Sequence, residues 1–241
     1  MLRFDRELRR FIRYRSNPAD PESIAHDGIT CLYEDREGVI WAGVTDSGVT
    51  RFETKPPSFQ KLPHELGNPN SSGEPFVSAI YEDRRGTLWI GTRQALSRLN
   101  LETGQCTRYH PSEPGVAPDV ISLGEDRPDR LWVGTFNHGL LLFDRKTGNY
   151  KTYRYSSKDP HSLSNDIVTR LLVDRHGTLW AATWDGLNRF DASTEQFTRY
   201  YFDPQRKDLL YLECRPSARV TQLYSVEVTL TRNSIWNRIL K

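Results

Sequence analysis

Four aspartates recur at regular intervals along the chain, and repeated carboxylates are candidates for general acid–base chemistry. They are Asp35, Asp83, Asp126 and Asp174. Each stands at the same place in a repeated phrase, and three of the four phrases read Asp-Arg-x-Gly, which is typical of a tight hairpin turn. Four equivalent copies at turns predict a structural role, so we expect no catalytic residue among them.

Other chemical motifs point the same way. The six histidines are scattered, and no two have the spacing of a zinc-binding pair. The sequence has no Gly-x-Ser-x-Gly elbow, no P-loop and no dinucleotide-binding fingerprint. The three cysteines are far apart, which favours neither a disulfide framework nor a metal site. We therefore expect no catalytic residue, no metal and no cofactor.

A tryptophan follows each aspartate and defines an internal repeat. Trp41, Trp89, Trp132 and Trp180 are separated by 48, 43 and 48 residues. Around each runs a phrase close to Leu-Trp-Ile-Gly-Thr, followed by one close to Gly-Leu-x-Arg-Phe-Asp and then by a closing Phe-x-x-Tyr. With the apolar stretch before the aspartate, each repeat reads as four short strands, A to D. Consecutive apolar residues in strand B predict that both its faces are buried.

Four-stranded repeats of this length predict an all-β fold, a β-propeller of about four four-stranded blades plus a half blade at the N-terminus, within residues 1–204. The expected bounds are 1–14 for the half blade, then 15–60, 61–110, 111–154 and 155–202. Residues 205–241 lose the repeat, and we expect an atypical tail that is read out of frame or disordered. The third hairpin lacks a glycine, so we expect a distorted turn with Asp129 in the left-handed region.

The balance of charged residues limits which classes of partner the chain can bind. Lys and Arg number 33 against 31 Asp and Glu, and this near balance predicts no nucleic-acid partner. The arginines between Arg3 and Arg15 are expected to form a solvated edge, with a nucleic-acid arm as the alternative. No signal peptide or membrane-spanning stretch is visible, so we expect no membrane contact from this chain.

The two ends of each blade differ in how much their residues vary from one repeat to the next. In an antiparallel blade the A–B and C–D turns share one end, and the B–C loops and D-to-A linkers share the other. The second end carries variable residues and Pro-rich linkers, and binding residues concentrate on loops that a rigid scaffold holds. We expect ligand-binding residues there, namely Arg93, Phe136, Asn137, His138, Trp184 and Asp185. The alternative is that they only pack near the propeller axis.

The hairpin phrase Glu-Asp-Arg-x-Gly-x-Leu-Trp-Ile-Gly-Thr, with Gly-Leu-x-Arg-Phe-Asp and the linker Asp-Pro-x-Ser-Leu-Ser, resembles the two-component regulator propeller repeat. The resemblance implies a periplasmic sensor region of bacterial hybrid histidine kinases and an incomplete arc of a seven-bladed propeller. It also implies non-catalytic sensing of a glycan or another small molecule, with another propeller segment or a second copy of the chain as partner. This chain has no kinase motif.

Two other functions stay open. One is a protein-interaction scaffold. The other is a propeller glycosidase or lyase, because the hairpin phrase superficially resembles the sialidase Asp box. The spacing from Asp35 to Gly38 is three residues, however, where the Asp box has two.

Overall fold

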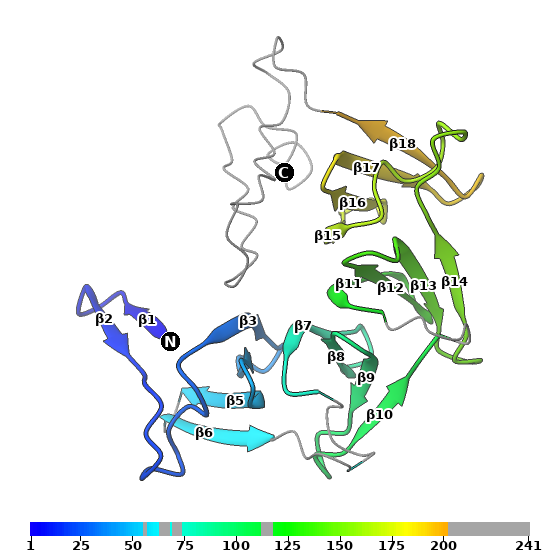
Figure 1. Ribbon diagram of the computed structural model, residues 1–241. Helices are drawn as coiled ribbons and strands as arrows, with labels where there is room; N and C mark the ends of the chain where they lie inside the picture. Colours follow the sequence, from blue (N-terminus) through cyan, green and yellow to red (C-terminus); the bar gives the residue numbers. More distant parts are fainter. Residues whose placement is uncertain (55–56, 63–67, 69–73, 112–117, 202–241) are drawn as a thin grey trace. The chain divides into compact units, whose positions relative to one another are not determined.

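The computed structural model describes residues 1–54, 57–62, 68, 74–111 and 118–201 (Figure 1). The predicted atypical tail, 205–241, lies outside the described residues. The described chain separates into two compact units, one holding the residues up to His110 together with 118–120, and the other holding those from Ile121 onward. All regular structure in the described ranges is β-strand, which confirms the all-β prediction.

The first unit contains a hairpin and two four-stranded sheets. The hairpin pairs β1 (Leu2–Asp5) with β2 (Arg10–Arg13) and corresponds to the expected half blade. Blade 1 consists of β3 (Ile29–Glu34), β4 (Ile40–Val44), β5 (Gly48–Thr54) and β6 (Pro57–Leu62). Blade 2 consists of β7 (Val77–Glu82), β8 (Leu88–Thr92), β9 (Leu96–Leu99) and β10 (Cys106–Tyr109). β6 runs past residue 60, where the sequence placed the end of this blade.

The second unit contains two more four-stranded sheets. Blade 3 consists of β11 (Val120–Arg127), β12 (Arg130–Thr135), β13 (Leu140–Asp144) and β14 (Tyr150–Tyr153). Blade 4 consists of β15 (Val168–Val173), β16 (Leu179–Thr183), β17 (Gly186–Asp191) and β18 (Gln196–Tyr200). In all four sheets the strands are ordered as in the sequence, which is the up-and-down meander of a propeller blade.

Strand B forms the centre of each core. Every residue of β8 is buried, as the unbroken apolar phrase predicts. Trp41 of blade 1 packs with Val77 of blade 2, and Trp132 of blade 3 packs with Val168 of blade 4. Neighbouring sheets approach closely at the glycine of strand B, because a Cβ atom on Gly134 would lie 2.9 Å from the Val168 carbonyl oxygen. Within each unit, the blades therefore stack face to face.

The repeated aspartate holds each A–B hairpin and its tryptophan together. In blade 2, Asp83 Oδ1 accepts the backbone N–H groups of Arg85 and Thr87, at 2.8 and 2.9 Å. Its Oδ2 atom accepts the Trp89 indole N–H at 2.8 Å. Blades 1 and 4 repeat the indole bond, from Trp41 to Asp35 at 2.8 Å and from Trp180 to Asp174 at 3.0 Å. Both oxygens of each carboxylate are used, which is the structural role that the repetition predicts.

The third hairpin is different. β11 continues to Arg127, and only Pro128 and Asp129 form the turn. Asp129 has φ of 73°, as expected, and a proline followed by a residue of positive φ is the pattern of a type II turn. Asp126 is consequently part of the strand. Among the described residues, neither its Oδ1 atom nor the indole nitrogen of Trp132 has a hydrogen-bond partner.

Candidate functional site

A threonine at the end of strand B shapes each B–C loop of the second unit. Thr135 Oγ1 donates to the Gly139 carbonyl at 2.7 Å and accepts the His138 N–H at 2.9 Å. Thr183 Oγ1 donates to the Gly186 carbonyl at 3.1 Å and accepts the Asp185 N–H at 3.3 Å. Both threonines are buried, and their hydroxyl groups form hydrogen bonds with backbone N–H and carbonyl groups of the loop. The residues between them and the next strand are left at the surface.

Phe136 and Trp184 are the first residues of these two loops, and their rings meet. The centroids are 5.9 Å apart at 86°, an edge-to-face contact, and both side chains are half-buried. The corresponding residues in blades 1 and 2 are Thr45 and Arg93. Because the same backbone position is polar in two blades, the propeller fold does not require an aromatic pair here.

Two polar side chains, one in the Trp184 loop and one in the linker, are hydrogen-bonded to each other. The Asn165 amide nitrogen donates to Asp185 Oδ2 at 2.7 Å, and Asp185 itself is exposed. Asn165 also accepts the Ile167 N–H at 2.7 Å, so the D-to-A linker holds the amide in place. A planar amide and a carboxylate beside two aromatic rings offer fixed donors and acceptors next to an apolar surface. This combination suits recognition of a small polar ligand.

An ion pair from the linker supports the blade 3 loop. Arg154 donates to Asp166 Oδ2 from Nη2 at 2.7 Å and from Nε at 3.0 Å, and Nη2 also donates to the Asn137 carbonyl at 3.2 Å. Asp166 in turn accepts the Gly139 N–H on its backbone carbonyl at 2.9 Å. His138 Nδ1 is buried and has no hydrogen-bond partner among the described residues. Linker contacts therefore hold this loop at the Asn137 carbonyl and at the Gly139 N–H, on either side of His138.

Arg93 belongs to the first unit, so the prediction that it shares a surface with the other five residues stays a prediction. Its guanidinium carbon lies 4.3 Å from the centroid of the Phe76 ring. It also acts on Asp119: burial raises the pKa of that carboxyl, the Arg93 charge opposes the rise, and Glu74 adds to it. Arg93 thus lies in a local group of linker residues.

The sequence reasoning missed Asn165, Arg154 and Asp166. The sequence did carry a signal for Asp166, because this residue stands two positions before strand A of its blade. Asp27 stands at the same place before blade 1 and accepts the Ser16 N–H at 2.9 Å. Asp166 accepts the N–H of Tyr155, the matching residue, at 2.7 Å. A repeated aspartate at a linker end therefore marks a loop anchor.

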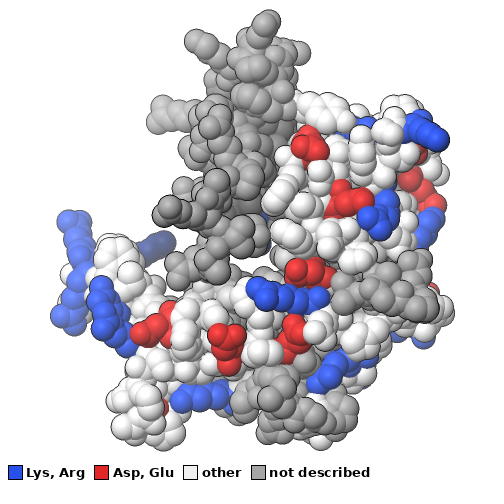
Figure 2. Space-filling view, in the orientation of Figure 1, with Lys and Arg blue, Asp and Glu red and all other residues white. Residues whose placement is uncertain are grey.

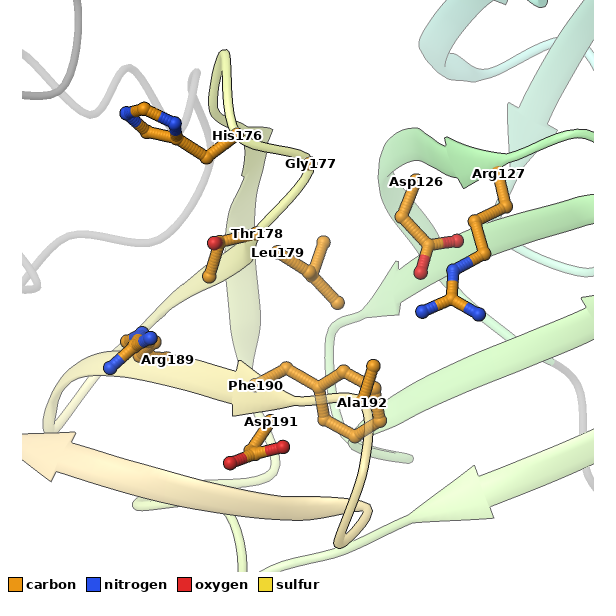
Figure 3. Close-up of a pocket in the computed structure, with 10 residues that line it drawn as sticks. All are labelled: Asp126, Arg127, His176, Gly177, Thr178, Leu179, Arg189, Phe190, Asp191 and Ala192. Carbon is orange, nitrogen blue, oxygen red and sulfur yellow. The ribbon is translucent and has the colours of Figure 1, made fainter.

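A second feature lies at the other end of blades 3 and 4, where the sequence led us to expect only tight turns. A cavity of about 240 Å³ opens between the hairpin of blade 3 and that of blade 4. Figure 3 shows Asp126 and Arg127 on one wall, with His176, Leu179 and Phe190 on the other. The missing glycine in the third hairpin was the only sequence signal for it.

Basic side chains gather over β1 and β2 (Figure 2). Four arginines of this hairpin are exposed, at positions 6, 9, 10 and 13. The described residues contain no cluster of three or more His, Cys, Asp or Glu side chains with the geometry of a metal site. Nor do they form any helix of the length and apolarity that a bilayer crossing requires.

Three segments match the family model described as Two component regulator propeller, at residues 23–46, 71–94 and 162–185. Each match runs from the end of a linker through strand A, the hairpin and strand B. They fall in blades 1, 2 and 4, the blades whose tryptophan donates to the hairpin aspartate. The matches confirm the resemblance seen in the repeated phrases.

Solved structures and a curated relative agree with this family. The extracellular domain of the putative hybrid two component system BT3049 from B. thetaiotaomicron is 25% identical, with a TM-score of 0.68 over 83% of this chain and 28% of that one. The corresponding domain of BT4673 is 21% identical, with a TM-score of 0.66 over 84% of this chain and 25% of that one; at this identity it supports the fold alone. "Histidine kinase P4" of Formosa agariphila is 27% identical over 37% of this chain.

The chain spans a small part of each of these proteins, and only 7% of the Formosa agariphila kinase. What it shares with them is therefore the propeller repeat.

Proposed function

We propose, from the premise that this chain is built of two-component regulator propeller repeats, that it is a non-catalytic ligand-sensing segment of the extracytoplasmic part of a two-component sensor. The similar domain of BT3049 is the extracellular domain of a putative hybrid two component system, which supports this location. The ligand is a glycan or another small polar molecule that contacts the B–C loop end of blades 3 and 4.

The aromatic pair Phe136–Trp184 is the observation that carries the proposal. Aromatic faces bind the apolar C–H surfaces of sugars, while neighbouring amide and carboxylate groups bond to hydroxyls. The carboxylate of Asp185 and the amide of Asn165 stand in the adjacent loop and linker, hydrogen-bonded to each other. The fold itself accepts Thr45 at the matching position of blade 1, so the propeller fold does not require an aromatic residue at this position.

Binding of oligosaccharides to the purified chain tests the proposal. A panel of neutral and acidic oligosaccharides is screened on an array, and each hit is measured by isothermal titration calorimetry. We expect Trp184→Ala and Phe136→Ala each to weaken binding by about two- to tenfold, because stacking on an aromatic ring contributes about 0.5–1.5 kcal/mol. Thr45→Ala is the matched control, since it changes the same loop position in blade 1.

Two outcomes contradict the proposal. One is a ligand whose affinity is the same for the parent chain and for both aromatic variants. The other is hydrolysis or elimination of a bound oligosaccharide by the purified chain, detected by chromatography, which would indicate an enzyme.

A protein-interaction scaffold is the second candidate, and one observation favours it. Tyr155 and Tyr201 are both about half exposed, and the Arg199 guanidinium lies 5.5 Å from the Tyr155 ring and donates to the Tyr201 hydroxyl at 3.4 Å. Tyrosine and arginine are enriched at protein interfaces. Capture of a protein partner by the parent chain, lost in a Tyr155→Ala/Tyr201→Ala double variant, would support this function over ligand sensing.

A further inference from the structure

The cavity at the hairpin end of blades 3 and 4 exists because one turn is short. Between blades 1 and 2, the side chain of Arg36 reaches across and donates to the carbonyls of Asp83 and Arg84, at 3.0 and 3.1 Å. Arg127 occupies the matching position in blade 3, but its hairpin turns at Pro128 and Asp129. Among the described residues, the side chain of Arg127 makes no hydrogen bond or ion pair. The gap that an arginine closes in the first unit is open here.

Asp126 is the unusual residue in the cavity wall. Its side chain is 4% exposed, and its Oδ2 atom lies 3.4 Å from Arg130 Nη2. Its Oδ1 atom is buried without a hydrogen-bond donor among the described residues. The equivalent carboxylates, such as Asp83, use both oxygens for the hairpin and the indole. A buried acceptor without a donor costs about 1–3 kcal/mol, so the site gains from any ligand that supplies one.

The remaining walls offer the opposite charge and a few apolar groups. Arg127 is exposed and also lines the cavity (Figure 3), and among the described residues its guanidinium has no carboxylate partner. Leu179, Phe190 and Ala192 line the blade 4 side of the cavity. A buried acceptor without a donor, a cation without an ion-pair partner among the described residues and three apolar residues therefore line a largely polar cavity of about 240 Å³.

We propose that this cavity binds a free α-amino acid with an apolar side chain. Its ammonium group donates to the Asp126 carboxylate, its carboxylate pairs with the Arg127 guanidinium, and its side chain packs on Leu179 and Phe190. A zwitterion fits better than an ion of one sign, because a simple anion faces the Asp126 carboxylate and a simple amine faces Arg127. The volume is that of a small metabolite. This site is separate from the Phe136–Trp184 loops, and the inference does not rest on the proposed function.

Calorimetric titration of the full chain with L-leucine and L-phenylalanine tests the site. N-acetyl-leucine lacks the ammonium group and leucinamide lacks the carboxylate, so we expect each to bind about tenfold or more weakly than leucine. Asp126→Asn and Arg127→Gln are expected to weaken leucine binding by a similar factor. Lys146→Gln is the control, because Lys146 lies on the C–D turn of blade 3 and is largely exposed.

A cavity-filling variant keeps the test decisive if Asp126→Asn fails to fold. Ala192 is exposed, so Ala192→Phe is expected to leave the thermal unfolding temperature unchanged and to abolish leucine binding. The proposal is overturned if neither amino acid binds at millimolar concentration, which would mean that the cavity holds only water. It is also overturned if N-acetyl-leucine binds as tightly as leucine, or if Ala192→Phe folds and binds leucine normally.

Discussion

The indole nitrogen of Trp89 lies 2.8 Å from Asp83 Oδ2, and both side chains are buried. The carboxylate also accepts two backbone N–H groups of its hairpin, so a single aspartate connects the turn to the core of the blade. The matching pair in blade 3, Asp126 and Trp132, has the same sequence spacing but no such bond. The consequences of this contrast are measurable.

Trp89→Phe should destabilise the chain more than Trp132→Phe. Both changes remove part of a buried ring, but only Trp89→Phe also takes a hydrogen-bond donor from a buried carboxylate. We expect a difference of about 1–3 kcal/mol in the free energy of unfolding, measured by urea titration with circular dichroism. Equal losses in the two variants would show that the indole–carboxylate bond contributes nothing to stability.

Gly134→Ala should weaken the packing of blade 3 on blade 4. The added methyl group would lie 2.9 Å from the Val168 carbonyl oxygen, and backbone cannot move aside cheaply. Overpacking of this kind costs about 1–3 kcal/mol. The matched control is Ala182→Gly, because Ala182 stands at the same strand B position in blade 4 and its change removes a methyl group. Thermal unfolding that is unaltered in Gly134→Ala would contradict the close approach of the two sheets.

Acid should remove the stability that Asp174 contributes. Burial raises the pKa of Asp174, but bonds from the Trp180 indole and the backbone N–H groups of Thr178 and His176 outweigh burial and hold it below its usual value of 3.8. A carboxyl group whose pKa is lower in the folded than in the unfolded chain stabilises the fold at pH values above the unfolded pKa. This stabilisation is lost as the pH falls through the folded pKa.

The unfolding temperatures of the parent chain and Asp174→Asn, compared between pH 7 and pH 3, check this prediction. We expect the parent chain to unfold at a higher temperature than Asp174→Asn at pH 7. We expect this difference in unfolding temperature to shrink below about pH 4. A difference in unfolding temperature that stays constant between pH 7 and pH 3 would contradict the lowered pKa of Asp174.

Cys106 should resist alkylation until the chain unfolds. Burial raises the pKa of its thiol to about 11, although the Arg108 charge opposes the rise, so the reactive thiolate is scarce at pH 8. Peptide mapping after treatment with iodoacetamide is expected to find Cys106 unmodified in buffer and modified in urea. Rapid labelling of the folded chain would show that β10 is accessible.

The candidate loop site was predictable in part. Alternation of strand direction places all B–C loops of a blade series at one end, so Phe136 and Trp184 were expected at the same end of their blades. Their ring contact was not predictable, because it depends on the spacing between two stacked sheets. Asn165 and Arg154 were missed, since they follow no chemical motif and act only through contacts with neighbouring loops.

The sequence by itself determined the blades: a repeated pattern of apolar residues, turn aspartates and glycines acts over a few residues and gives the same strands in each copy. It also determined the unusual third turn, because Asp129 replaces a glycine where positive φ is needed. Only the tertiary structure decided what the unusual turn does. Whether Asp126 meets an indole or faces a cavity depends on the length of the neighbouring strands and on the hairpin of the next blade. Such contacts join residues far apart in the chain, and no local pattern encodes them.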